Sequence, residues 1–494
     1  MSLWYRDVIM RRQGAVAVLT LLIAQGVLCT LVSAQTTIIP SLRVSERYDS
    51  NVFFTPKSLL GPNDEPEDFI TMVTPQITMA HQGSLMRGSL SVGAVVSKYI
   101  NNPDLDFTGY NVAGALDLTQ AANKVSQRIS NLTLRGTSQY TPSITGAGVA
   151  GFRQTQGTIG TGLALNNGIV ANRANIHRYN LGVTGSYQLT PTTAMTGTFD
   201  YSKISFGNQS GNVNNPLFDT TGYLGSTTVA TRISARDTVG ATSTISHFIQ
   251  EQSNASSGQG SFTMFSETLN WNRLWTQELT TNLAGGAIYR PPVGSDIPGQ
   301  SVKSQIIPTA TASMTYSSFA EGLRGMFDSL PSLDGSLNPG GIMAPGAYTA
   351  SLISSYSMFP STAFGAGPTN IYNLGANATG GIARNLTALA VVTYSHGSSS
   401  NPDRTFDSVN VTGGLGTLIG PVLADLTVNW LYFSNSTTQL AGQSDYQFSK
   451  KMVMLAFSYA FTSPEFFREG ISFPSSFGTG SSPSGDGSGI LRKE

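Results

Sequence analysis

The fold is decided by a short stretch near the C-terminus, 425-DLTVNWLY-432, in which the apolar residues Leu426, Val428, Trp430 and Tyr432 alternate with Asp425, Thr427 and Asn429. A period of two places the two sets on opposite faces of a β-strand. The same alternation recurs along the chain, for example over residues 110–118, 181–189 and 453–461. Segments of about 10 residues divided by turns suit the thickness of a bilayer crossed by tilted strands.

The less apolar face of these segments carries Ser, Thr, Asn, Gln and Gly in place of charged residues. Only 11% of the chain is charged, against about 25% in an average soluble protein. The outer face of a soluble β-sandwich needs many Lys and Glu residues, whereas a membrane barrel turns an apolar face to lipid and a polar face to its lumen. We therefore predict an all-β, transmembrane, antiparallel up-and-down β-barrel in the outer membrane. It has about 18 strands, within a range of 16 to 20, because the strand count is ambiguous between residues 331 and 370.

The connections between strands fall into two length classes. Short turns are expected at 81–83, 190–193, 235–237, 276, 380–384 and 420–421, and long loops at 49–67, 141–175, 207–223, 250–260, 291–301, 331–345, 396–404 and 434–446. Alternation of short and long connections is typical of a barrel whose termini both face the periplasm. The long stretch 141–175 is the candidate constriction of the pore.

Both ends of the chain differ from the barrel. Residues 1–34 are typical of a secretory signal peptide, with a basic start, an apolar run and a small-residue cleavage site at Ser33-Ala34; an uncleaved anchor is the alternative. The barrel then spans 35–461, and the Ser-, Gly- and Pro-rich residues 462–494 form a tail predicted to be disordered. Cleavage removes Cys29, the only cysteine, which leaves neither disulfides nor thiolate ligands.

The mature chain is almost neutral. The full sequence has 28 basic and 28 acidic residues, and loss of Arg6, Arg11, Arg12 and Asp7 leaves a net charge of −2. No global field then attracts nucleic acid, and we predict no nucleic-acid partner.

The final predicted strand ends with Phe457, Tyr459 and Phe461 at every second position. This alternate-aromatic ending resembles the terminal signal by which bacterial outer-membrane barrels are recognised for insertion. The resemblance implies the barrel-insertion machinery as a partner, although the chain departs from the usual pattern by continuing for 33 residues after Phe461.

A second resemblance lies near the start of the predicted barrel. Residues 46-ERYDSNVF-53, followed by Asp68-Phe69-Ile70 and Thr74-Pro75, resemble the opening of a family of β-barrel porins often encoded beside exopolysaccharide synthesis and export genes. The match covers about 40 residues. It implies an outer-membrane channel or an export-associated barrel, with polysaccharide as a possible partner, and it supplies no ligand residues.

Motifs that suggest enzymes or cofactors have simpler explanations. The glycines Gly146, Gly148 and Gly151 fit a dinucleotide fingerprint, but no acidic residue follows within the required distance, so an exterior loop is favoured.

The acidic cluster Asp64, Glu65, Glu67 and Asp68 could bind Ca²⁺, but prolines interrupt it and a solvated loop is favoured. The four histidines, at 81, 177, 247 and 396, have no metal-ligand spacing. We predict no enzyme, no cofactor and no metal.

Strand phase identifies the charged residues expected to line the lumen and set its selectivity: Arg87, Asp117, Arg135, Arg178, Asp200 and Asp425. Two hypotheses remain open for Arg135 and Arg178. They could form an electropositive wall that attracts anions, or they could be paired with lumen acids such as Asp117 and Asp200.

The predicted function is a porin-like channel for passive passage or export of polar solutes, associated with exopolysaccharide through the resemblance above. The alternative is a structural or adhesive barrel with a plugged lumen that binds partners through its long loops, and a third hypothesis is a barrel hydrolase. The barrel prediction requires Leu116, Leu134, Leu181, Val428 and Phe457 to point out to lipid.

Overall fold

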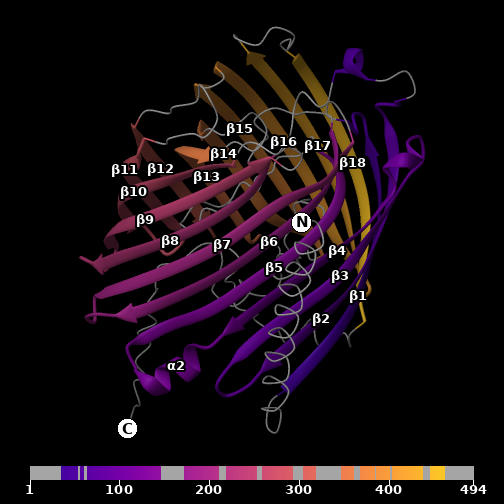
Figure 1. The fold of residues 1–494 in the computed structure, drawn as a ribbon. Coiled ribbons are helices and arrows are strands. Elements are labelled where there is room, and N and C mark those ends of the chain that lie inside the picture. Colours follow the sequence, from indigo (N-terminus) through magenta and orange to yellow (C-terminus); the bar gives the residue numbers. More distant parts are fainter. Residues whose placement is uncertain are drawn as a thin grey trace, which may run out of the picture.

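The computed structural model contains one closed, antiparallel sheet of 18 strands (Figure 1). It describes residues 35–53, 56–60, 64–145, 172–210, 218–252, 259–292, 304–318, 346–360, 368–383, 385–400, 403–437 and 446–461. The predicted signal peptide, the tail after Phe461 and Gly146 to Gly151 lie outside these residues.

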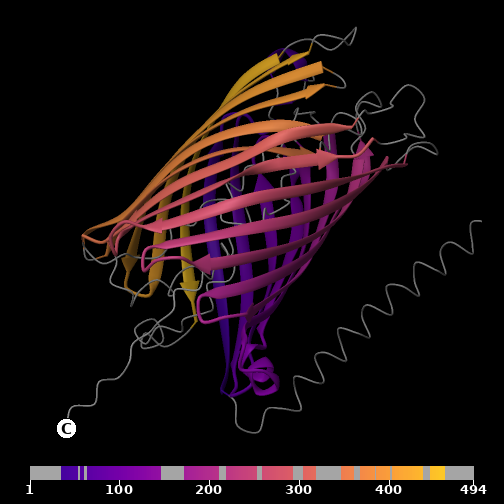
Figure 2. The ribbon, with the colours of Figure 1, turned by 90° about the vertical axis from the view of Figure 1, so that its left-hand side faces the viewer.

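The strands are longer than the bilayer alone requires and cross the barrel wall obliquely (Figure 2). Their bounds are β1 (Gln35–Asp49), β2 (Asp68–Gln82), β3 (Arg87–Tyr99), β4 (Phe107–Asp117), β5 (Ile129–Thr145), β6 (Asn172–Gln188), β7 (Thr193–Ser210), β8 (Phe218–Arg232), β9 (Asp237–Gln252), β10 (Gln259–Leu274), β11 (Leu279–Arg290), β12 (Gln305–Ser317), β13 (Tyr348–Pro360), β14 (Pro368–Ala383), β15 (Leu386–Ser400), β16 (Asp403–Ile419), β17 (Val422–Thr437) and β18 (Tyr446–Ala460).

Each strand pairs with its neighbours in the chain, and β1 pairs with β18 to close the sheet. Closure leaves no unpaired edge, which a membrane-spanning sheet requires. β1 begins and β18 ends at the same end of the barrel, where Ser41 lies opposite Ala460. We call this the turn end and the opposite one the loop end. The barrel class and the count of about 18 strands are confirmed.

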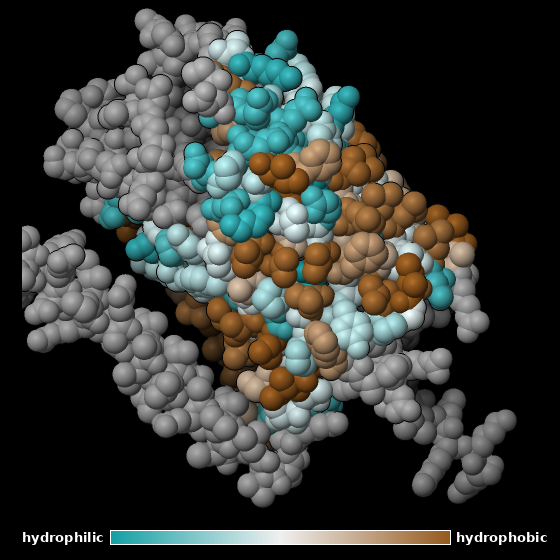
Figure 3. Space-filling view, turned by 90° about the vertical axis from the view of Figure 1, so that its right-hand side faces the viewer, coloured by the Kyte–Doolittle hydropathy of each residue, from teal (hydrophilic) through white to brown (hydrophobic). Residues whose placement is uncertain are grey.

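The two faces of the wall differ as predicted. Leu181, Val428 and Phe457 are 51%, 49% and 46% exposed on the outer face. Leu116 and Leu134 are half-buried on the same face, opposite each other in the β4–β5 register. Seen from the side of β1 to β4, apolar side chains gather over the middle and lower wall, below a hydrophilic top (Figure 3). The outer face is therefore suited to lipid.

Aromatic side chains mark both borders of the apolar band. Pairs near the loop end include Tyr201–Tyr223 and Phe265–Tyr289, with ring centroids 5.4 and 6.4 Å apart. Near the turn end, Tyr316 stacks on Tyr348 at 5.3 Å. Such girdles are typical of membrane barrels, where aromatic rings lie at the lipid–water interface.

Three sequence predictions about connections are wrong. Strand order joins β12 to β13 at the turn end, so the long connection that includes 331–345 starts and finishes there, although residues 331–345 themselves lie outside the described residues. Residues 396–404 are mostly strand: β15 ends at Ser400 and β16 begins at Asp403, and the Ser-rich ends pair in register. Parts of 141–175 also belong to β5 and β6, and its centre lies outside the described residues.

The sequence also did not predict the short helices. Helix α2 (Thr119–Val125) lies at the turn end between β4 and β5, and two 3-10 helices, Lys57–Leu59 and Pro103–Leu105, lie in loops. Among the described residues, no helix combines the length and the apolar character needed to cross a membrane.

The motif of the second resemblance forms the closing seam at the loop end. Asp49 at the end of β1 binds Lys450 of β18, with 2.7 Å between Oδ2 and Nζ and with both side chains buried. Asp68 is fully buried and accepts hydrogen bonds from the backbone N–H groups of residues 100–102. These two carboxylates therefore hold the seam and the β3–β4 connection, which is a structural role.

Candidate pore lining

The inner face of the barrel is polar and divides into two unlike walls. The inward positions of β17, β18 and β1 to β7 carry many charged residues, and we call this surface the charged wall. The strands β12 to β15 contain no Asp, Glu, Lys or Arg at all, and their inner face is the uncharged wall. In an 18-stranded barrel, β12 to β15 lie nine strands from β3 to β6, so the two walls face each other across the lumen.

Two of the six predicted lumen residues form an ion pair in the charged wall. Arg135 on β5 donates from Nη2 to Oδ1 of Asp200 on β7 across 2.7 Å. Gly182 of β6 lies between them, and a Cβ there would meet both side chains. Both remain about a quarter exposed, at 28% and 22%. Of the two hypotheses for Arg135, the structure therefore agrees with pairing to a lumen acid.

The other predicted lumen residues are not gathered at one point. Asp425 on β17 is buried and binds Arg43 of β1 at 3.0 Å. Arg178 lies on the inward phase of β6, with a buried Nε that has no hydrogen-bond partner in the described residues. Arg87 lies opposite Asp117 in the β3–β4 register, near the turn end. Asp117 accepts a hydrogen bond from the backbone of Thr119.

Sequence reasoning missed three cations of this wall: Arg43, Arg47 and Lys450. Arg43 and Arg47 alternate with Val44, Glu46 and Tyr48, and Lys450 precedes the apolar alternation of β18 by three positions. The phase of β1 could have identified the two arginines. Lys450 could not be found in this way, because its neighbours in sequence are polar on both sides.

The uncharged side of the lumen presents hydroxyl and amide groups. A hydroxyl–amide patch covers β13 to β17 and consists of Ser351, Ser355, Asn373, Asn377, Thr393, Ser395, Ser408, Asn410, Thr412 and Asn429. Part of it is hydrogen-bonded internally. Ser395 donates to Asn373 Oδ1 at 2.6 Å, and Asn429 donates to Asn410 and Thr412 at 2.6 and 2.7 Å.

Other hydroxyls of the patch make no such bonds. Ser351, Thr393 and Ser408 are 6%, 5% and 0% exposed, and their oxygen atoms have no hydrogen-bond partner in the described part of the chain. A buried hydroxyl without a partner is uncommon and costs on the order of 1–3 kcal/mol. Because these oxygen atoms are almost inaccessible, a solute that brings its own donors and acceptors reaches them only where neighbouring side chains move aside.

Apolar side chains line the inner wall at the loop end. One aromatic cluster, Ile371, Phe406, Phe433 and Phe448, lies directly beyond the hydroxyl–amide patch, and Phe433 is opposite Ser408 in register. A second cluster contains Phe248, Phe262, Met264, Ile288 and Ile307 on β9 to β12, and a third contains Ile176, Ile204 and Phe206. These clusters form an apolar collar inside the mouth of the barrel.

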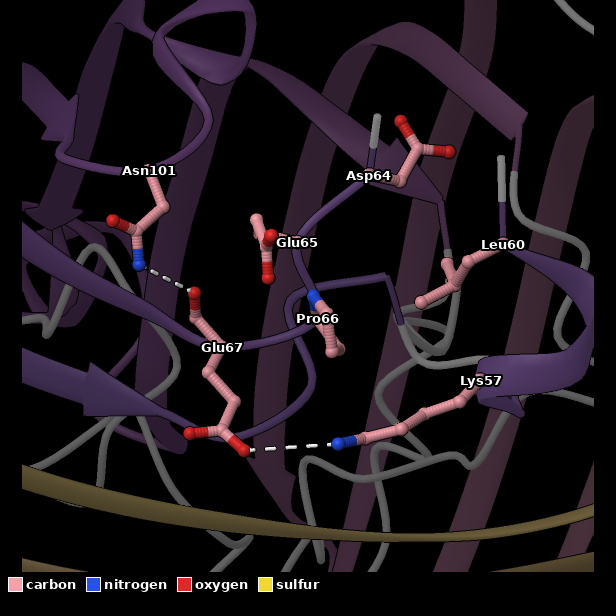
Figure 4. Close-up of a pocket in the computed structure, with 7 residues that line it drawn as sticks. All are labelled: Lys57, Leu60, Asp64, Glu65, Pro66, Glu67 and Asn101. Carbon is pink, nitrogen blue, oxygen red and sulfur yellow. Dashed lines mark hydrogen bonds and ion pairs between the residues drawn. The ribbon is translucent and has the colours of Figure 1, made fainter. Parts of the chain in front are cut away.

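The acidic cluster of the β1–β2 loop borders a pocket outside this lining (Figure 4). Lys57 reaches Glu67 at 3.8 Å, and Asn101 donates to the backbone oxygen of Glu67 at 2.9 Å. Asp68 turns away to the backbone bonds described above. The described residues include no group of three or more His, Cys, Asp or Glu that could hold a metal ion.

No family model matches the sequence, and no curated protein matches it. The solved structures to which the chain is similar include the following three. A bacterial polysaccharide outer membrane secretin has 9% identity and a TM-score of 0.32, over 86% of this chain and 99% of that one. The FrpB iron transporter of Neisseria meningitidis has 10% identity and a TM-score of 0.41, over 86% and 81%. OpdK of Pseudomonas aeruginosa has 11% identity and a TM-score of 0.40, over 86% and 99%.

The location of this chain follows from its own geometry. The sheet is closed, its outer face is apolar between two aromatic girdles, and its inner face is polar. This combination satisfies every backbone group in a bilayer and is the architecture of outer-membrane barrels. The chain is an outer-membrane β-barrel.

Proposed function

We propose that the barrel is a water-filled channel for polar solutes, and that uncharged, hydroxyl-rich solutes pass along the hydroxyl–amide patch. Barrels of 16 to 18 strands leave room for an aqueous channel. The observation that carries the proposal is the hydroxyl–amide patch itself, in which the hydroxyls of Ser351, Thr393 and Ser408 have no hydrogen-bond partner among the described residues. Amide and hydroxyl groups both donate and accept, which suits a solute covered with hydroxyls.

The aromatic cluster beyond the patch supports the same class of solute. Phe433 lies 6.1 Å from Phe406 and 5.5 Å from Phe448, between ring centroids. Binding sites commonly combine aromatic surface with a few placed polar groups. A sugar ring has both an apolar face and a rim of hydroxyls. Association with exopolysaccharide export is the finer form of this proposal, and it rests on the sequence resemblance at residues 46–75.

The charged wall supplies the second part of the proposal, which is selectivity among ions. Arg87, Asp117, Arg135, Arg178, Asp200 and Asp425 are proposed to set it together. Because Arg135 is paired with Asp200 and Asp425 with Arg43, we expect weak selectivity in the native channel.

The test is conductance in a planar bilayer, followed by solute-induced blockade of the current. We expect discrete open steps, and we expect a neutral maltose-type oligosaccharide to block them more strongly than a sulfated one of equal length. Equal blockade by both sugars would contradict the role of the uncharged wall. Absence of steps from folded protein at high loading would contradict the channel.

The apolar collar favours one alternative, a barrel plugged at its mouth. Buried Phe and Ile side chains on the inner wall offer a surface on which further chain can pack. A folded barrel that never conducts, together with binding of a partner at the loop end, would support this structural or adhesive function.

A further inference from the structure

Arg178 is a cation of the charged wall without an acid to pair with. It lies on the inward phase of β6, opposite Gln139 of β5 and Ile204 of β7. Its Nε atom is buried, and neither a hydrogen bond nor an ion pair joins its guanidinium to the described residues. The residue as a whole is half-buried, so part of the side chain is accessible from the lumen. A guanidinium charge in a partly desolvated wall is unfavourable unless an anion accompanies it.

The other partly or fully buried arginines of the described inner wall have polar or charged neighbours in the barrel. The pairs are Arg43 with Asp425, Arg135 with Asp200 and Arg290 with Gln305. Arg47 belongs to the closing seam, which also contains the carboxylates of Asp49 and Asp68. Arg178 has no such acid in its surroundings.

The nearest acid on this part of the inner face is already paired. β5 and β6 contain no Asp or Glu, and Asp200 is the only acid of β7. Its register partner Gly182 lies four positions from Arg178 on β6, which is about 13 Å along the strand. Asp200 binds Arg135 at 2.7 Å, and Asp219 of β8 lies on the outward phase. The wall beside Arg178 therefore has one positive charge that no acid balances.

An amide donor two strands away also lacks a partner. Asn111 of β4 lies in the same row across the sheet, opposite Gln139, which is itself opposite Arg178. Asn111 is 8% exposed, and its Nδ2 atom has no hydrogen-bond partner among the described residues. Arg135 reaches Asp200 across one intervening strand, and the same span separates Arg178 from Asn111. Both donors therefore lie within reach of one small ligand.

We propose that Arg178 and Asn111 form a binding site for the carboxylate of a small monoanion. A carboxylate accepts two parallel hydrogen bonds from a guanidinium, and its remaining lone pairs accept from an amide. One unbalanced cation favours a single negative charge over a dianion. The buried Ile204 beside Arg178 keeps water from one side of the site, which strengthens the attraction. Because Nδ2 of Asn111 is covered, the carboxylate reaches it only where a neighbouring side chain moves aside.

This site is separate from the proposed route of neutral solutes. It lies on β4 to β6, whereas the hydroxyl–amide patch covers β13 to β17. Binding of a carboxylate goes beyond that proposed function and does not require a solute to cross the barrel. Binding and stability therefore test the site independently of conductance, and a closed channel would contradict the proposed function without contradicting this site.

Benzoate and benzamide are matched probes, because they differ mainly in the negative charge. Saturation-transfer NMR of the barrel in detergent should give an apparent affinity about tenfold higher for benzoate than for benzamide. Arg178→Met should abolish this difference. Arg232→Met, which removes an exposed arginine at the turn end, should preserve it. Equal affinity for the two probes in the wild type, no saturable benzoate signal, or equal losses in both variants would overturn the proposal.

Asn111→Asp tests whether the two residues share one site, because it supplies the missing acid. The new carboxylate should bind Arg178, lower the unfolding constant in urea on the order of tenfold and abolish benzoate binding. In an Arg178→Met background the same substitution should raise the unfolding constant, since the acid is then left without a cation. Equal effects of Asn111→Asp in the two backgrounds would overturn the shared site.

Discussion

The charged wall and the uncharged wall line the same lumen but use their polar groups differently. In the charged wall, Arg135, Asp200, Arg43 and Asp425 form ion pairs within the barrel. In the uncharged wall, Ser351 and Thr393 leave their hydroxyls without partners. A charge in a partly desolvated lining is unfavourable without a partner, whereas an unsatisfied hydroxyl costs much less. The charged wall therefore stabilises the barrel, and the uncharged wall remains available to a solute.

The largest expected effect is on stability, in the charged wall. Lys450→Met should lower the free energy of unfolding by about 3–5 kcal/mol, because it leaves the carboxylate of Asp49 buried without its cation. The two side chains are only 4% and 2% exposed. Urea unfolding in lipid vesicles measures the loss. Lys451→Met, at the exposed neighbouring position, should change stability by no more than about 0.5 kcal/mol, and equal losses in both variants would refute the difference.

The second-largest effect is expected on ion selectivity, when the Arg135–Asp200 pair is substituted. Asp200→Asn removes the acid from the Arg135 pair and should shift the channel toward anions by roughly severalfold in permeability ratio. Arg135→Gln with Arg178→Gln should shift it toward cations. Reversal potentials under a salt gradient measure both changes. An unchanged potential in both variants would show that these residues do not control ion passage.

In the uncharged wall a substitution should change solute binding more than stability, which is the reverse of the expectation for the charged wall. Thr393→Val removes a buried hydroxyl that has no partner, so the stability should stay within about 1 kcal/mol or rise. Blockade by a neutral oligosaccharide should nevertheless weaken, on the order of tenfold in the blocking concentration, since one hydrogen bond is lost. Thr244→Val on β9, outside the patch, is the control, and equal weakening there would contradict a local binding surface.

The smallest effect is expected for an ion pair at the rim. Lys98 at the end of β3 and Asp106 in the β3–β4 connection are 2.6 Å apart, but the lysine is 67% exposed. Lys98→Ala should cost less than about 1 kcal/mol in urea unfolding. A loss comparable to that of Lys450→Met would contradict the distinction between buried and exposed pairs.

The pH dependence of this rim pair has a definite sign. Hydrogen bonds from the Lys98 side chain and from the Tyr99 N–H lower the pKa of Asp106 from its ordinary value. The contribution is therefore complete above the unfolded pKa and is lost only as the pH falls through the lower folded value. Wild type and Lys98→Ala should converge in stability only in acid, below about pH 4.

Several features of the barrel were predictable because they are repeated. Period-two alternation in strands such as β4 and β17 predicted the outward side chains, and Leu181 and Val428 are exposed to lipid as expected. The phase of each strand also placed Arg135 and Asp200 on one face. The stretch 331–345 was misplaced, because local composition reports that a segment is a connection but not the end of the barrel on which it lies.

The sequence by itself determined the class of fold, the number of strands within a narrow range and the face on which each strand residue lies, since these depend on local alternation and length. Only the tertiary structure decided which residues meet across strands. Asp49 and Lys450 are 401 positions apart, and closure of β1 on β18 brings them together. The positions of the charged and uncharged walls follow from register and closure, which no local pattern encodes.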